Sequence, residues 1–322
     1  MTISIVLATY NGEKYLREQI DSVLAQTLMP DEIIVSDDGS TDGTWDILEE
    51  YKNRNPSLFH LYHNVGRHGP HANFKWAFQY VTGDVVVPCD QDDIWLPEKL
   101  ERCAAAMAYD VSFVFCQEMI LHEDGNKGMI YHKMPLLRTC IFGEVIPGHL
   151  IMCRREVLEV FNIAPEITYD WGMTLYAAIH RTGKEIDYVG CIWRRHANVV
   201  TTEFSDHKNK ILKVEQISKW KKLCRSIRMM RRGVRSEVVA RRMDSLGRIL
   251  EYYQRIQESH VVRNIEKQTA GALICACWQY AAIVCKEKEF KEANIRTKIG
   301  KMAHAFCYPA MWWYDYHKHD SL

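Results

Sequence analysis

The sequence lacks several features that would place it in a class at once. Its eleven cysteines include no CxxC pair, which favours reduced thiols over a disulfide framework or a zinc site. No GxGxxG or GxxxxGK[ST] motif supports a dinucleotide or P-loop site. The longest apolar stretch, residues 270–285, is shorter than the ~20 residues that span a bilayer, and the chain does not begin with a signal-peptide pattern. We therefore expect a cytoplasmic protein without a transmembrane helix.

The formal net charge of zero conceals a strong asymmetry along the 322 residues. Residues 1–204 carry 17 Lys and Arg against 29 Asp and Glu, whereas residues 205–322 carry 24 against 12. Most of the basic excess lies in residues 205–248. This polarity indicates two roles in one chain, with the second part near an anionic surface. Mutual attraction of the two halves is the alternative explanation.

Short apolar runs alternate with amphipathic stretches in the first part of the chain. The run 3–9 predicts a strand, and the stripe over 16–24 predicts a helix that Asn11 can cap. Further strands are expected at 32–36, 58–63, 84–88, 111–116 and 185–200, further helices at 44–52, 71–82, 97–107 and 169–183, and a strand leading into a helix at 148–161. The alternation predicts parallel strands joined by right-handed crossovers, followed by a mainly helical region that begins near residue 205.

Polar clusters follow three of the expected strands, at residues 9–13, 37–42 and 90–93. In a parallel sheet the carboxyl ends of strands lie on the same side, and ligands bind beyond them. We therefore expect these three clusters to line one rim of the sheet. That rim is the predicted ligand site.

Three carboxylates crowd the last of these clusters, at Asp90, Asp92 and Asp93. A hard divalent cation, Mg²⁺ or Mn²⁺, would relieve their repulsion, although acidic clusters also occur at turns and helix caps. Tyr10 and Asp38 add an aromatic face and a hydrogen-bond acceptor, a pair suited to recognising a nucleobase. A nucleoside diphosphate held through a metal fits these residues better than one held by backbone amides.

Six motifs occur in the order typical of family 2 glycosyltransferases: ATYNG (8–12), IIVSDDGSTDGT (33–44), HANF (71–74), CDQDDIW (89–95), YDWG (169–172) and RRHANVV (194–200). Residues 1–204 resemble this family, and in particular its rhamnosyltransferase-like bacterial branch. The resemblance implies a GT-A fold, a Rossmann-like α/β/α sandwich with a mostly parallel central sheet. It also implies a divalent metal, Mg²⁺ or Mn²⁺, and a nucleotide-diphospho-sugar donor such as dTDP-rhamnose or a UDP-hexose.

The resemblance further implies roles for individual residues. Ala8, Thr9 and Tyr10 would border the base and ribose, Asp38 would bond the base, Asn73 would lie near the nucleotide, Asp90 would face the ribose, Asp92 would bind the metal, His196 would contact the metal or the diphosphate, and Asp170 would be the catalytic base. Inverting transfer requires such a base and neutralisation of the departing diphosphate. From its position alone, Asp170 could equally be a helix N-cap.

Neighbouring positions qualify this picture. We expect Asp93 to cap the helix that begins near Pro97, and Trp171 either stacks on a sugar or fills the core. His71 stands where many members of the family have Arg, which leaves the nucleotide contact there open. The QxxRW motif of processive synthases is absent, which favours the addition of a single sugar to a saccharide or lipid-linked saccharide.

The second part of the chain suggests a membrane partner. The basic stretch 205–248 and the aromatic stretch 306–319 are expected to dock on the cytoplasmic face of an anionic membrane, unless the aromatic residues pack on the catalytic domain. The sequence leaves two other functions to compare, a nucleotidyltransferase and a nucleic-acid-binding protein. A nucleotidyltransferase would carry a Gly-rich basic loop after its first strand, and the sequence at 8–15 is not one. A nucleic-acid-binding protein could use 205–248, but no recognised module accompanies it, so no nucleic-acid partner is expected.

Overall fold

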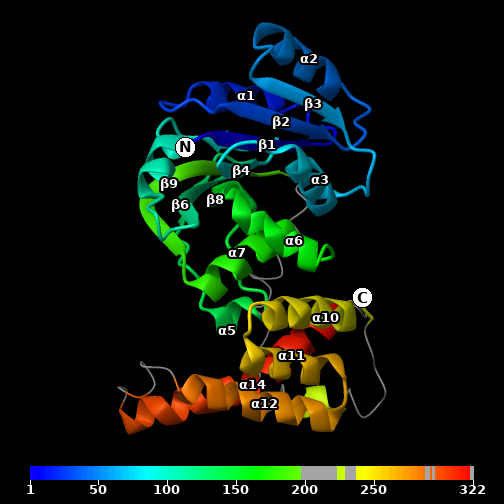
Figure 1. Cartoon of the computed structure of the whole chain (residues 1–322), viewed down its shortest axis with the longest axis vertical. Helices are drawn as coiled ribbons and strands as arrows, with labels where there is room; N and C mark the ends of the chain where they lie inside the picture. The colour runs from blue at the N-terminus through cyan, green and yellow to red at the C-terminus, as the bar shows by residue number, and fades with distance from the viewer. Residues whose placement is uncertain (197–222, 229–236, 287–290, 292–293, 320–322) are drawn as a thin grey trace. The chain divides into compact units, whose positions relative to one another are not determined.

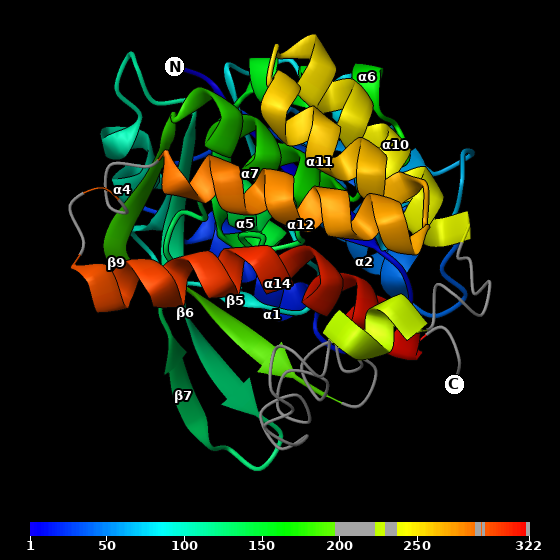
Figure 2. The same cartoon turned by 90° about the horizontal axis from the view of Figure 1, so that it is seen from below.

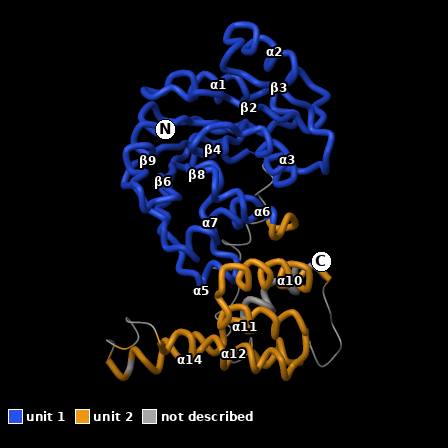
Figure 3. The backbone as a smooth tube through the Cα atoms, in the orientation of Figure 1, with its two compact units in different colours: residues 1–162, 168–205 blue, residues 163–167, 206–322 orange. Residues whose placement is uncertain are grey.

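The computed structural model describes residues 1–196, 223–228, 237–286, 291 and 294–319. The chain forms two compact units, drawn in blue and orange in Figure 3. The first comprises residues 1–162 and 168–205, and the second comprises residues 163–167 and 206–322.

The first unit is built on a sheet whose described strands follow the order β3-β2-β1-β4-β8-β6-β9-β5, with β7 paired to β6 (Figure 1). The strands are β1 (Ile3–Thr9), β2 (Glu32–Asp37), β3 (Phe59–His63), β4 (Val85–Cys89), β5 (Ile94–Trp95), β6 (Phe113–His122), β7 (Lys127–Ile130), β8 (Ile151–Arg154) and β9 (Gly183–Arg195). The expected parallel arrangement of the first four strands is confirmed. The sheet becomes mixed at β8, which runs antiparallel to both β4 and β6.

Helices connect these strands and include α1 (Leu16–Leu24), α2 (Thr44–Arg54), α3 (Pro70–Ala77), α4 (Lys99–Ala106), α5 (Leu137–Cys140), α6 (Val160–Ile163) and α7 (Tyr169–His180). Short 3₁₀ turns occupy Phe78–Tyr80, Gly148–Leu150 and Arg155–Glu159. The expected α/β class is thus confirmed. The connections place β2 and β3 on one side of β1 and β4 on the other. A sheet of this kind has its ligand crevice where the strand order reverses, here between β1 and β4.

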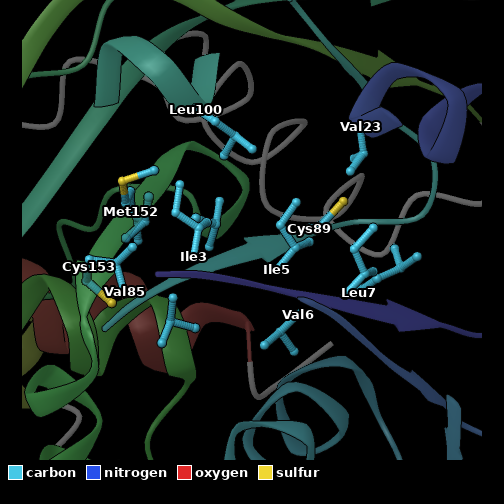
Figure 4. Close-up of a cluster of buried hydrophobic side chains, with 14 of the residues drawn as sticks. Ile3, Ile5, Val6, Leu7, Val23, Val85, Cys89, Leu100, Met152 and Cys153 are labelled. Atoms are coloured by element: carbon cyan, nitrogen blue, oxygen red, sulfur yellow. The ribbon is translucent and has the colours of Figure 1, made fainter. Parts of the chain in front are cut away.

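The core of the first unit lies on both faces of β1. Ile5 and Leu7 point to one side of the strand and Val6 to the other, as the two-residue repeat of a strand requires (Figure 4). Val23 of α1 and Leu100 of α4 cover the side of Ile5 and Leu7. Each of these side chains is at most 3% exposed. Burial of one such side chain stabilises the fold by about 1.5–3 kcal/mol. The buried central strand therefore holds its polar carboxyl end in a fixed position.

Several predicted boundaries are corrected by long-range contacts. Asn11 does not cap α1, because its Oδ1 accepts a hydrogen bond from the backbone N–H of Thr41 instead. Asp93 does not cap α4, because it is buried and accepts from the backbone N–H of Arg194. The predicted helix 169–183 ends at His180, since Arg181 has a left-handed φ of 60°.

The second unit is helical, as expected, and includes α10 (Glu237–Tyr252), α11 (Ile256–Glu266), α12 (Ala270–Cys285) and α14 (Ile295–His319). Segment 163–167 belongs to this unit because α10 holds it. The guanidinium of Arg248 donates to the carbonyl oxygen of Ile163 at 2.9 Å and to Glu166 Oε1 at 2.7 Å. Residues 205–222 and 229–236 of the predicted basic stretch 205–248 lie outside the described residues, as do the side chains of 311–319 in the predicted aromatic stretch. Within the described part of the chain, no helix is both long and apolar enough to cross a membrane.

Candidate functional site

The carboxyl ends of β1, β2 and β4 lie on the same side of the sheet. Thr9 pairs with Asp37, and Leu7 pairs with Cys89. The loop after β1 is fastened to the loop after β4 by two reciprocal hydrogen bonds between the Tyr10 backbone and the Gln91 side chain, at 2.9 and 3.0 Å. The expected rim is therefore one connected surface, and the ring of Tyr10 stands 56% exposed on it.

The two carboxylates at the carboxyl end of β2, Asp37 and Asp38, have different environments. Asp37 is buried and accepts hydrogen bonds from Thr9 Oγ1 and from the Ser40 backbone. Asp38 accepts from Asn64 Nδ2 at 2.6 Å and from the Gly69 backbone N–H at 2.7 Å, and His68 Nδ1 lies 2.9 Å from its Oδ1. The Asp38 carboxylate thus fastens the loop between β3 and α3 to the rim.

Three other residues with an implied nucleotide role, Asn73, Thr9 and Ala8, form the inner part of the rim. Asn73 is 2% exposed, and its amide group bonds Ser36 through both ends, donating to the carbonyl oxygen at 2.8 Å and accepting from the hydroxyl. Thr9 is 1% exposed, and its hydroxyl donates to Asp37. Ala8, next to it, is half-buried. These three side chains shape the rim from below, whereas Tyr10 is open to solvent.

Asp92 and His196 come together across 104 positions of the chain. His196 Nε2 lies 3.0 Å from Asp92 Oδ2, and the imidazole packs against the ring of Tyr15 at 4.7 Å between centroids. The Asp92 side chain remains 22% exposed. Burial, and then the neighbouring charge of Asp90, raise the pKa of Asp92 above its usual range. A cation next to Asp92 would reverse this effect.

A buried network lies beneath the acidic cluster. His149 lies in the 3₁₀ turn before β8, and its Nε2 lies 2.7 Å from Glu118 Oε2. On its other side, His149 Nδ1 lies 3.5 Å from Asp90 and 3.9 Å from Asp93. His132 completes the network at 2.7 Å from Glu118 Oε1. The imidazole of His149 therefore bridges the acids of the rim to a glutamate on β6.

The charges of this network are coupled. Burial alone would lower the pKa of His149, but Asp93, Asp90 and Glu118 raise it well above the usual value. Burial would raise the pKa of Glu118, but the hydrogen bonds from the two histidines lower it to about 2. Burial, together with the neighbouring Asp90 and Asp92, raises the pKa of Asp93 to about 7, although His149 opposes this shift. These pKa shifts describe a cationic His149 that lies between acidic side chains.

The first turn of α7 carries Asp170. Its Oδ1 accepts a hydrogen bond from the backbone N–H of Trp171 at 2.8 Å and lies 3.9 Å from His71 Nδ1, an atom that has no hydrogen bond within the described part of the chain. The N-cap position of α7 is Thr168, so Asp170 is not the capping residue. Trp171 is 2% exposed and donates to the carbonyl oxygen of Cys140, which places it in the core.

Tyr169 connects the surroundings of Asp170 to those of His149. Its ring is buried and lies 5.5 Å from that of His71. A Cβ added to Gly148 would meet the Tyr169 hydroxyl at 2.0 Å, so only glycine fits at the position before His149. The contacts thus run from Asp170 through His71, Tyr169 and Gly148 to the network around Asp90.

Residues 4–163 match the model of the family described as Glycosyl transferase family 2. The chain belongs to this family. Its first unit accordingly has the GT-A fold, and the match covers the loops after β1, β2 and β4.

Two relatives and one solved structure illustrate the similarity. An uncharacterized protein of Mycobacterium tuberculosis is 29% identical over 61% of this chain and 59% of its own length. The dTDP-rhamnosyl transferase RfbG of Shigella flexneri is 27% identical over 60% of this chain and 72% of its own length. The structure of S. aureus TarS 1–349 in complex with UDP-GlcNAc superposes with a TM-score of 0.51 at 19% identity, covering 88% of this chain and 92% of that one. The chain thus spans little more than half the length of the mycobacterial relative.

Sequence reasoning missed the residues that support the rim. His149 and Glu118 lie 31 positions apart and carry no motif, so nothing in the sequence pairs them. Gln91 stands inside the CDQDDIW motif, yet its bond to Tyr10 spans 81 positions. The sequence motifs also do not include Lys99. This residue is 1% exposed, its ammonium group lies over the Trp95 ring, and it donates a hydrogen bond to the carbonyl oxygen of His149. The available signal was a lysine on the core-facing side of an amphipathic helix, because a lysine that is buried needs a fixed partner.

Proposed function

We propose that this protein is an inverting glycosyltransferase that moves one sugar from a nucleotide-diphospho-sugar to a saccharide or lipid-linked saccharide in the synthesis of a surface polysaccharide. The observation that carries the proposal is the cluster of Asp90, Asp92 and His196 at the reversal point of a family 2 GT-A sheet. The names of the relatives support a dTDP-rhamnose or UDP-hexose donor.

The donor would lie across the rim between β1 and β4. The exposed Tyr10 ring offers a face for the base, and the Gln91 amide holds its backbone in place. Asp38, Asn73, Thr9 and Ala8 would act by fixing the loops that enclose the nucleotide. Asp90, whose side chain is 37% exposed, is accessible to a ribose hydroxyl.

The residues present fit a divalent cation. Asp92 and His196 present an oxygen and a nitrogen 3.0 Å apart, and the pKa of Asp92 is raised by burial and by a neighbouring carboxylate. Carboxylate-rich sites with few protein ligands suit Mg²⁺ or Mn²⁺ completed by phosphate oxygens. When bound there, the cation would supply positive charge opposite the leaving diphosphate.

Asp170 would remove the proton from the acceptor hydroxyl. Its side chain is 21% exposed, and the hydrogen bond from Trp171 fixes one oxygen while the other faces no donor among the described residues. His71 lies beside it at 3.9 Å and would orient the carboxylate or accept a bond from the substrate. A general base positioned in this way typically contributes about 10²–10⁴ in rate.

A screen of nucleotide sugars with Mn²⁺ and Mg²⁺ tests the proposal. A donor that binds only the folded protein raises its melting temperature, and transfer or slow hydrolysis identifies the sugar. Asp170→Asn keeps the acceptor oxygen of the Trp171 bond, so we expect unchanged donor binding and transfer lowered by about 10²–10⁴.

Asp110→Asn is the matched control, because Asp110 is an exposed carboxylate between α4 and β6, outside the loops that form the rim. Full transfer by the Asp170→Asn variant would show that another group is the base. If no nucleotide sugar stabilises the wild-type protein with either cation, the proposed function is wrong.

A further inference from the structure

Helix α12 is apolar on all sides. Its sixteen residues, AGALICACWQYAAIVC, include no charged side chain. One face packs inward and buries Leu273, Ala276, Cys277, Tyr280, Ala281 and Val284. The opposite face is open, with Ile274 38% and Trp278 63% exposed. A helix without a polar face normally lies in a protein core or against lipid, so this open face calls for a partner.

The neighbouring helix α14 extends the open apolar surface. Figures 1 and 2 both show α12 and α14 running side by side. Ile295, Ile299 and Met302 follow the spacing i, i+4, i+7 on α14 and are 78%, 61% and 45% exposed. The rings of Trp278 and Phe306 meet at 4.8 Å, which makes the stripes of the two helices continuous. We call this surface, formed by Ile274, Trp278, Ile295, Ile299 and Met302, the α12/α14 face.

The chain around the α12/α14 face is predominantly basic. Residues 267–310 carry seven Lys and Arg against three Glu, and the described lysines among them are Lys267, Lys286, Lys291, Lys298 and Lys301. The glutamates of the connection, at 287, 289 and 292, lie outside the described part. An exposed apolar stripe bordered by lysines is complementary to a bilayer surface that contains anionic headgroups.

We propose that the α12/α14 face is the site at which this protein docks on an anionic membrane surface. Trp278 and the isoleucines would enter the boundary between headgroups and acyl chains while the lysines meet the phosphates. The sixteen residues of α12 are too few to span a bilayer, so the helix would lie in the surface. This inference goes beyond the proposed function and does not depend on it.

A second copy of the chain is a weaker occupant for this face. A two-fold interface brings the same patch of each subunit together. The lysines of one copy would then face those of the other, and like charges across an interface oppose association. An anionic lipid surface instead presents charge of the opposite sign.

Flotation of the full chain with vesicles tests the proposal. We expect binding to phosphatidylcholine vesicles that contain phosphatidylglycerol, weaker binding to phosphatidylcholine alone, and a decrease in high salt. Trp278→Ala with Ile299→Ala should weaken binding at least about tenfold, because two large apolar side chains no longer enter the lipid. Lys298→Glu should weaken binding to the anionic vesicles by about fivefold or more.

Matched controls exist in the first unit. Tyr109→Ala removes an exposed aromatic ring and Lys127→Glu reverses an exposed charge outside the α12/α14 face, and both variants should float like the wild type. Unchanged melting temperatures establish that the variants fold. Absence of flotation with either vesicle, or wild-type flotation of both α12/α14 variants, would overturn the proposal. A dimer in sedimentation that the Trp278 variant dissolves, without vesicle binding, would assign the face to a second copy.

Discussion

At the scale of single residues, the acidic rim depends on buried groups beneath it. Asp90, Asp92 and Asp93 lie close together, and the charge that opposes them comes from His149. Glu118 in turn holds His149 and His132, each at 2.7 Å. The crowded carboxylates are visible in the sequence as a motif. Their compensation is not visible there, because it comes from β6 and from the turn before β8, which only the folded sheet brings together.

Replacement of Glu118 by Gln tests this support. Removal of one partner from a buried ion pair costs about 3–5 kcal/mol, so we expect the free energy of unfolding at neutral pH to fall by roughly that amount. The pKa of Glu118 is lowered to about 2 in the folded protein, below its ordinary 4.5. Its stabilisation is therefore fully present above pH 4.5 and is lost as the pH falls toward 2.

Chemical denaturation of both proteins across this pH range provides the measurement. The difference in stability between wild type and Glu118→Gln should be constant above pH 4.5 and should shrink at lower pH. Glu144→Gln, a substitution of an exposed glutamate, should show no such difference. A difference that stays constant down to pH 2 would mean that Glu118 is not held as a carboxylate.

At the scale of elements, sequence periodicity predicted what local patterns determine. The strands β1–β4 and the helices between them stand where the apolar repeats placed them, because each repeat reports which side of its own element is buried. Pairing between distant strands is not encoded in that way. The antiparallel entry of β8 and the two-residue strand β5, which pairs with β9 across about a hundred positions, were therefore not predicted.

The sequence placed the loops at the rim correctly, but it did not predict the hydrogen bonds that join these loops. Asn11 was predicted to cap α1, yet it joins the loop after β1 to the loop after β2 through Thr41, with a φ of 46°. The roles that family resemblance assigns to Asp38 and Asn73 stay predictions. The structure adds that both side chains already hold neighbouring loops, so their substitution would alter the shape of the rim as well as any contact.

Gly12→Ala tests the coupling of these loops. A Cβ at residue 12 would meet Gln91 Oε1 at 2.2 Å, so the amide must leave the Tyr10 backbone. Loss of the two hydrogen bonds should lower stability by about 1–3 kcal/mol and should weaken donor binding, because the loops after β1 and β4 separate.

Gln91→Ala is the comparison that isolates this effect. It removes the same two bonds without a clash, and the pair Gly12→Ala with Gln91→Ala should be no less stable than Gln91→Ala alone. Melting temperatures of the three variants give the answer. Additive losses would show that Gly12 is needed for a reason other than the approach of Gln91.

At the scale of the whole molecule, the boundary drawn from composition and the division by compactness differ in one segment. Composition placed a single boundary near residue 204. The structure assigns residues 163–167, which precede α7, to the helical unit. Arg248 of α10 bonds Ile163 and Glu166, and Ser245 Oγ donates to Glu166 Oε2 at 3.2 Å. Composition cannot reveal that residues 163–167 belong to the helical unit, because this segment is too short to have a distinct composition.

Truncation at residue 204 should therefore destabilise the catalytic unit that remains. In the full chain Ala164 and Ile167 are 0% and 4% exposed, and the truncated protein would lose α10 as the partner of that segment. Asp170 follows the segment directly, so we expect lower transfer and faster proteolysis near residue 165 together with a reduced melting temperature. Arg248→Ala in the full chain should reproduce the proteolytic sensitivity in part. Arg241→Ala, which removes an exposed ion pair with Glu237, should not. A truncated protein with the melting temperature and transfer rate of the full chain would show that the first unit needs no partner for residues 163–167.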